Sequence, residues 1–85
     1  MGILSWDNEN ITNNGTIIAT EYGVFTNGDG ATVTNNQSGI INSQIGILGG
    51  GTGTITNNGT INTTEEGIVG QNTDLIINNG TINVT

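Results

Sequence analysis

The sequence of 85 residues contains no Cys, His, Lys, Arg or Pro. Without Cys and His, the chain can form neither a disulfide nor a zinc site with thiolate or imidazole ligands. A chain this short buries only about 60 to 65% of the surface that it exposes when unfolded, and chains of this size often depend on such crosslinks. Its stability must therefore come from another source.

The absence of Lys and Arg leaves a formal net charge of −7, from seven Asp and Glu residues. Nucleic acids and anionic membranes bind proteins mainly through cationic side chains, which this chain does not have. No apolar run approaches the roughly 20 residues of a membrane span, and no basic segment before an apolar run indicates a signal peptide. We therefore predict no nucleic acid partner and no insertion into a membrane.

What the sequence does contain is an internal repeat rich in Asn, Thr, Gly and Ile. A first motif begins at Ile11, Val33, Ile55 and Ile76, at a nearly constant interval, and it reads ITNNGTI, VTNNQSGI, ITNNGTI and IINNGTI. An interval of this length is typical of solenoids. A second motif, Gly followed by two apolar residues, begins a little past the middle of each interval, at Gly23, Gly46 and Gly67, with a further copy at Gly2.

Short segments rich in β-branched residues and bounded by Gly and Asn favour strands over helices. Each period holds three such segments, and parallel crossover connections are almost always right-handed. The sequence therefore predicts an all-β fold, a right-handed parallel β-helix (β-solenoid) of about four coils of roughly 20 to 22 residues, with three short strands per coil. Its single domain, residues 1–85, divides into half-coil 1–10, coils 11–32, 33–54 and 55–75, and half-coil 76–85.

Stacking the coils in register aligns β-branched aliphatic residues in three columns, which we predict to form the interior. The second coil has one residue more than the others in its first motif, and a bulge at residues 37–39 would absorb it. The columns are Ile11, Val33, Ile55 and Ile76; Ile17, Ile40, Ile61 and Ile82; and Ile3, Val24, Ile47 and Ile68.

The Asn pairs of the first motif form two more columns. Asn is common in turns because it tolerates a left-handed backbone, but that preference alone does not explain four pairs in register. Stacked side-chain amides can hydrogen-bond from one coil to the next. We predict such asparagine ladders along Asn13, Asn35, Asn57 and Asn78, and along Asn14, Asn36, Asn58 and Asn79.

The motif ITNNGTI, repeated at this nearly constant interval, resembles the repeats of bacterial autotransporter and adhesin passengers, which are right-handed parallel β-helices. The resemblance covers residues 11–85 and, less fully, residues 2–10. It implies the fold. Because β-helix families include adhesins, lyases, tailspikes and fibres, it does not select one activity.

The two ends of the chain complement each other, because half-coils 76–85 and 1–10 joined together have nearly the length of one period. Neither end carries the Pro or Lys by which natural sheets protect their edges. We therefore predict a structural subunit that stacks head to tail into a homopolymeric filament, on the cell surface or outside the cell. The predicted polymer interface comprises Gly2, Ile3, Leu4, Trp6, Ile76, Ile77, Asn78, Asn79, Ile82 and Val84.

Two alternatives to the filament remain open. In one, the sequence is part of a longer repeat protein. In the other, it is an adhesin-type β-helical binding module that does not polymerise.

A fourth apolar column follows the Gly-Ile/Val motif by one residue. Strand alternation turns this column to the outer surface, unless a bend at the corner turns both apolar residues inward. On the outside it would be a lateral contact surface along which filaments bundle. Its members are Leu4, Phe25, Leu48 and Val69, with Trp6 nearby.

The sequence contains few residues that are suited to enzymatic catalysis. Nucleophilic triads need His or Cys, and Schiff-base chemistry needs Lys. Glu21 and Glu65 align on either side of Gln44, so they could form a general acid and base across two coils. The simpler interpretation is that they are surface acids in contact with solvent. Asp7, Asp29 and Asp74 lie in comparable loops, where they would form an acidic corner in contact with solvent. The alternative is that they form a weak calcium site. We predict no enzymatic activity and no cofactor.

An outward column of Thr12, Thr34 and Thr56 is similar to the flat Thr arrays of ice-binding solenoids. Those arrays need two parallel ranks of Thr, and here the fourth coil has Ile77 in this column. Ice binding is therefore a minor prediction.

Overall fold

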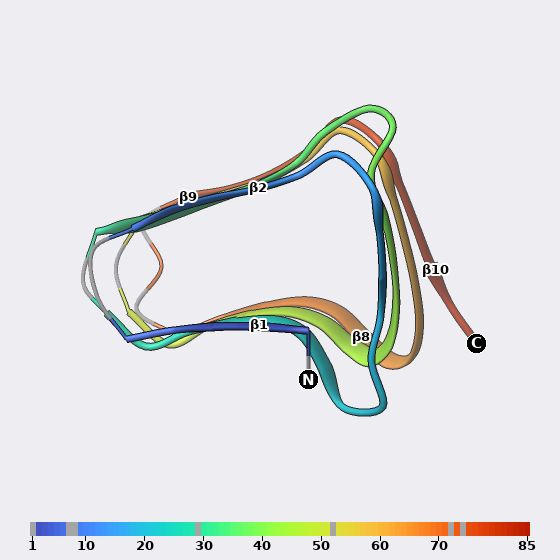
Figure 1. Cartoon of the computed structure of the whole chain (residues 1–85), viewed down its shortest axis with the longest axis horizontal. Coiled ribbons are helices and arrows are strands. Elements are labelled where there is room, and N and C mark those ends of the chain that lie inside the picture. The colour runs from blue at the N-terminus through green and yellow to red at the C-terminus, as the bar shows by residue number, and fades with distance from the viewer. Residues whose placement is uncertain (1, 7–8, 29, 52, 72, 74) are drawn as a thin grey trace.

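The computed structural model describes residues 2–6, 9–28, 30–51, 53–71, 73 and 75–85, and in these residues it contains ten strands and no helix. The chain winds as a parallel β-solenoid of about four turns, as the sequence predicts. Seen in Figure 1, it runs clockwise as it recedes from the N-terminus, so the solenoid is right-handed. The strands are β1 (Ile3–Ser5), β2 (Asn10–Asn13), β3 (Thr16–Ile18), β4 (Tyr22–Thr26), β5 (Ala31–Asn35), β6 (Ile40–Gly49), β7 (Gly53–Asn57), β8 (Thr60–Gly70), β9 (Leu75–Asn78) and β10 (Thr81–Val84).

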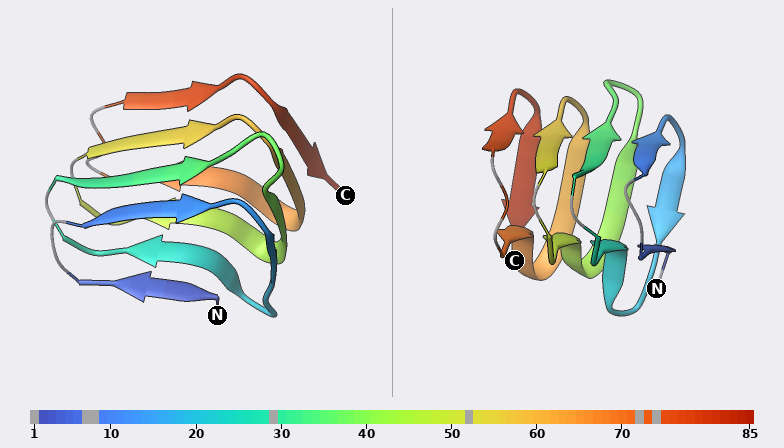
Figure 2. Two further views of the ribbon diagram at one scale, coloured as in Figure 1. Left: turned by 45° about the horizontal axis from the view of Figure 1, so that its top comes forward. Right: turned by 90° about the vertical axis from the view of Figure 1, so that its left-hand side faces the viewer.

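The solenoid has three faces, and every strand pair is parallel and joins one coil to the next (Figures 1 and 2). The first face consists of β2, β5, β7 and β9. The second consists of β3, the N-terminal parts of β6 and β8, and β10. The third consists of β1, β4 and the C-terminal parts of β6 and β8. β6 and β8 thus continue around the corner between the second and third faces.

Along the strands of the first face, side chains point alternately to the interior and to the surface. In β5, Val33 and Asn35 are buried, and Thr32 and Thr34 are half-buried on the other side of the strand. β7 repeats this pattern with Ile55 buried. Such alternation is expected of a strand with one face on an apolar core, and it explains why Thr flanks the aliphatic residue on both sides in the two middle repeats.

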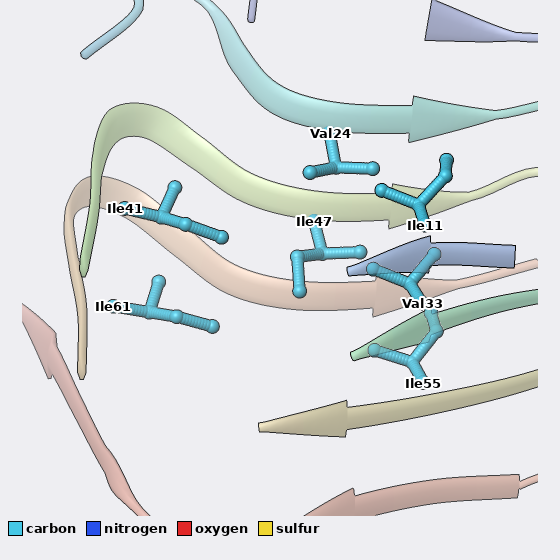
Figure 3. Packing of buried hydrophobic residues seen from close by; sticks show 7 residues of the cluster. All are labelled: Ile11, Val24, Val33, Ile41, Ile47, Ile55 and Ile61. Atoms are coloured by element: carbon cyan, nitrogen blue, oxygen red, sulfur yellow. The ribbon is translucent and has the colours of Figure 1, made fainter. Parts of the chain in front are cut away.

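The interior consists of the predicted columns, with one correction. Ile11, Val33, Ile55 and Ile76 pair in register on the first face, and so do Ile3, Val24, Ile47 and Ile68 on the third. Figure 3 shows how buried side chains from different coils converge on one core; it draws Ile11, Val24, Val33, Ile41, Ile47, Ile55 and Ile61. The fully buried aliphatic residues all lie in coils 11–32, 33–54 and 55–75; they are Val24, Val33, Ile41, Ile47 and Ile61.

The assignment of Ile40 to the interior was wrong. Ile41 pairs with Ile17 and with Ile61 and is fully buried, whereas Ile40 is 37% exposed. The loop after Asn36 holds two additional exposed residues, Gln37 and Ser38, and it protrudes at the corner between the first and second faces in Figure 1. A register shift between residues 43 and 45 removes one residue at the next corner relative to β8, so coil 33–54 is only one residue longer than coil 55–75.

Glycine is required at the corner between the second and third faces, because neighbouring coils approach closely there. A Cβ atom on Gly46 would collide with the carbonyl oxygen of Gly67 and with Cγ2 of Ile61. A Cβ on Gly23 would collide in the same way with the carbonyl oxygen of Gly46. The Gly of the second motif is therefore a packing requirement of the stack.

Candidate self-association surfaces

The C-terminal end of the stack exposes apolar residues whose equivalents in the middle coils are buried. Ile76 is 45% exposed, whereas Ile55 in the same column is 2% exposed. Ile68 and Ile82 are partly buried and pack against the core, whereas Ile61 is fully buried. None of the described residues covers this end, so it presents a continuous section through the hydrophobic core.

The N-terminal end of the stack has the matching property. Ile3 and Ile17 are partly buried, whereas their column neighbours Val24 and Ile41 are fully buried. Ile11 is 9% exposed and lies at the edge of the core.

The strands at both ends also have unpaired edges. Among the described residues, β1, β2 and β3 each pair with one neighbouring strand, and so do β9 and β10. The C-terminal part of β8 pairs with β6 alone. Outward N–H and C=O groups on such edges are templates for another parallel strand.

All ten residues of the predicted polymer interface lie in the first or last half-coil, but they do not form one kind of surface. Ile77 and Asn79 are on the outer side of the coil. Ile77 pairs in register with Thr56, and the side chain of Asn79 donates to that of Asn58. Trp6 is 62% exposed and follows β1. The ends of the stack also include Ile11, Ile17 and Ile68, which the predicted interface does not contain, because an end surface is one full turn of the solenoid and not a half-coil. The three-strand period was the signal that could have identified them.

The inner asparagine ladder is confirmed. Nδ2 of Asn13 donates to Oδ1 of Asn35, that of Asn35 to Asn57, and that of Asn57 to Asn78, each over 2.9 Å. Asn35 and Asn57 are fully buried. Their amides also bond the backbone of the turn, for example from Nδ2 of Asn35 to the carbonyl of Gly39. The ladder therefore replaces the hydrogen bonds to water that these amides lose on burial.

The second ladder is present in part, and a third was not predicted. In the outer column, Nδ2 of Asn36 donates to Asn14, and Nδ2 of Asn79 donates to Asn58 over 3.1 Å. The third ladder lies on the second face, where Asn83 donates to Asn62 and Asn62 donates to Asn42, each over 2.9 Å. Its signal in the sequence was an Asn directly after the interior Ile in three coils.

The fourth apolar column lies on the outside of the third face. Leu4, Phe25, Leu48 and Val69 pair in register, and none belongs to the core cluster, whereas Ile47 next to Leu48 is fully buried. Leu4 is 44% exposed. The ring of Tyr22 packs edge-on against Phe25, with centroids 5.2 Å apart and an interplanar angle of 78°. The column is a continuous apolar stripe on the surface of the stack.

The acidic residues in the described part of the chain are all glutamates, and their side chains are exposed. Gln44 lies between Glu21 and Glu65 and donates from Nε2 to Oε1 of Glu65 over 2.7 Å, at an exposed position. No group of three carboxylates, or of other metal-ligating residues, is found among the described residues. Asp7, Asp29 and Asp74, on which the calcium hypothesis rests, lie outside the described residues.

The first face carries more Thr than the sequence analysis recognised. Thr12, Thr34 and Thr56 pair in register, and Thr32 and Thr54 form a second rank beside them. Leu75 and Ile77 continue these ranks in the last coil, and Asn10 replaces Thr in the first. Two complete Thr pairs are therefore present.

The described residues include no helix long and apolar enough to cross a membrane. Comparison with models of protein families, with curated proteins and with solved structures found no match for this chain.

Proposed function

We propose that this chain is a structural subunit that stacks head to tail with copies of itself into a β-solenoid filament. The observation that carries the proposal is the match between its two end surfaces. A second copy placed one coil spacing beyond the first would bring β1, β2 and β3 onto the free edges of β8, β9 and β10. The three interior columns would then continue through the contact, with Ile68 next to Ile3, Ile76 next to Ile11, and Ile82 next to Ile17.

The free energy of this contact has two sources. Five isoleucines at the two ends are only partly buried, and covering them is worth on the order of 4 to 8 kcal/mol. Association costs about 4 to 15 kcal/mol of translational and rotational free energy. Apolar burial alone is thus comparable with the cost, and the backbone hydrogen bonds of three parallel strand pairs supply the remainder.

The contact joins two different surfaces, so it does not close on itself and produces an open chain of subunits. With about four coils per subunit at a spacing of about 4.8 Å, the axial repeat is about 19 Å. Electron microscopy and fibre diffraction of concentrated protein should show filaments with both spacings.

Two variants of β9 test the contact. Ile76→Asp places a charge in the exposed section of the core and should prevent filament growth, whereas Ile77→Asp alters the outer side of the same strand and should permit it. Monomers of the wild-type chain at all concentrations, by light scattering, would refute the proposal and favour an adhesin-type binding module. Filaments of both variants would refute the proposed contact.

The same proposal places the filament at the cell surface or outside the cell. The chain has no Lys or Arg, so it offers no site to trypsin-like proteases and uses no Lys or Arg ion pairs. An antibody against the chain should label intact cells of the source organism; labelling only after lysis would contradict this location.

A further inference from the structure

The inner ladder has one direction throughout the stack. In each of its three bonds, the amide nitrogen of one coil donates to the amide oxygen of the next coil towards the C-terminus. An amide carries both a donor and an acceptor, so a ladder with one direction has different groups at its two ends.

The side-chain amides of the first and last members of the ladder make fewer hydrogen bonds than that of a middle member does. Oδ1 of Asn57 accepts from Nδ2 of Asn35 and from the backbone N–H of Gly59. Oδ1 of Asn13 accepts only from the N–H of Gly15 among the described residues. Nδ2 of Asn78 has no acceptor among them, whereas Nδ2 of Asn57 donates to Asn78 and to two backbone carbonyls. The C-terminal end therefore presents a donor and the N-terminal end an acceptor.

We propose that the ladder continues across the contact between two copies, with Nδ2 of Asn78 donating to Oδ1 of Asn13 of the next copy, and that this bond fixes the polarity and register of the filament. The inference rests on the proposed head-to-tail function and names the residues that make it directional. Asn78 and Asn13 occupy the same column as Asn35 and Asn57, so continuation of the stack brings the two groups together.

The isoleucines alone would not determine polarity, because apolar contacts have no direction. If two C-terminal ends faced each other, two amide donors would lie against each other. If two N-terminal ends faced each other, two acceptors would do so. Either arrangement buries unpaired polar groups, which is costly. A slip of one residue would also turn the isoleucines to the outer side. The head-to-tail arrangement in register is the one that satisfies the ladder.

Assembly of three chains tests the inference: the wild type, Asn78→Ala, and Asn79→Ala as the matched control. Asn79 lies at the same end but on the outer side, where its Nδ2 already donates within the stack and any bond to the next copy would be exposed to solvent. We expect Asn78→Ala to raise the critical concentration for filament growth about tenfold or more, which corresponds to about 1.4 kcal/mol. Asn79→Ala should change it by less than about threefold. Circular dichroism should show equal strand content in all three chains.

The variant Asn78→Asp tests polarity, because it replaces the donor by acceptor atoms while the N-terminal end stays intact. Added in small amounts to wild-type protein, it should join by its N-terminal end and stop growth at one end only. The capped end is the C-terminal end of the filament, so labelled wild-type protein added afterwards should extend the filaments at the N-terminal end only. Equal critical concentrations of wild type and Asn78→Ala, or Asn78→Asp chains that do not cap, would overturn the ladder contact while leaving the filament itself intact. Absence of wild-type filaments would overturn both proposals.

Discussion

The amide of Asn35 donates to Oδ1 of Asn57 over 2.9 Å, and neither residue is exposed to solvent. Asn57 in turn donates to Asn78 and accepts from the N–H of Gly59, so its side chain satisfies several buried groups at once. A buried polar group without a partner costs about 1 to 3 kcal/mol. The ladder therefore stabilises the fold chiefly because removing one member leaves its neighbours unpaired.

We predict that Asn57→Ala lowers the free energy of unfolding by about 2 to 4 kcal/mol. Asn58→Ala removes an exposed bond with Asn79 and should cost less than about 1 kcal/mol. Urea unfolding followed by circular dichroism measures both. Equal midpoints for the two variants would show that the buried ladder contributes no more than an exposed hydrogen bond.

Two glycines should respond in opposite directions to substitution by Ala. Gly46→Ala places a methyl group against the carbonyl oxygen of Gly67 and should destabilise the protein by about 1 to 3 kcal/mol or more. A Cβ atom on Gly15 meets nothing within 4 Å, and Gly15→Ala should stabilise the protein by about 0.4 to 1 kcal/mol by restricting the unfolded chain. Thermal unfolding of the two variants provides the comparison, and a stable Gly46→Ala protein would contradict the close approach of coils at this corner.

The parts of the fold that could be predicted are those that repeat. The Ile11 column and the inner ladder follow from identical motifs at nearly constant spacing, because residues at equal positions in successive coils must stack. The choice between Ile40 and Ile41 could not be made from the pattern, since both are apolar and the loop before them has a unique sequence. It was decided by the backbone, which places Gly39 beside Gly15 and Gly59.

The candidate contact surface was predicted less completely for a related reason. The repeat indicates which residues stack, but not which of them remain exposed where the stack ends. The exposure of Ile68 follows from the position of the last half-coil, which ends on the second face and leaves the third face of the coil before it uncovered. The register of three faces had to be known before that residue could be assigned to the candidate contact surface.

In the column that contains Ser43 and Thr63, one substitution should increase the stability of the protein. Oγ of Ser43 donates to the carbonyl of Ile45 over 2.8 Å, whereas Oγ1 of Thr63 is buried without a partner among the described residues. Thr63→Val keeps the shape and removes the unpaired hydroxyl, so it should stabilise the protein by about 1 kcal/mol. Ser43→Ala removes a hydrogen bond and should destabilise it by about 1 kcal/mol. Chemical denaturation of both variants tests the difference in sign; destabilisation by Thr63→Val would mean that this hydroxyl has a partner.

The apolar stripe on the third face should contribute to association and little to folding. Leu48 is half-buried on the outer side between Phe25 and Val69, and its chain neighbour Ile47 is fully buried. Leu48→Asp should therefore fold, with a loss of about 1 kcal/mol from the lower strand propensity of Asp, whereas Ile47→Asp buries a charge and should not fold. If filaments associate side by side through the stripe, Leu48→Asp should leave single filaments of unchanged axial repeat, because the proposed axial contact does not use Leu48. Electron microscopy distinguishes single from bundled filaments, and circular dichroism reports the fold. Unfolding of Leu48→Asp would place the stripe in the core, and bundles as wide as those of the wild type would assign lateral contact to another face.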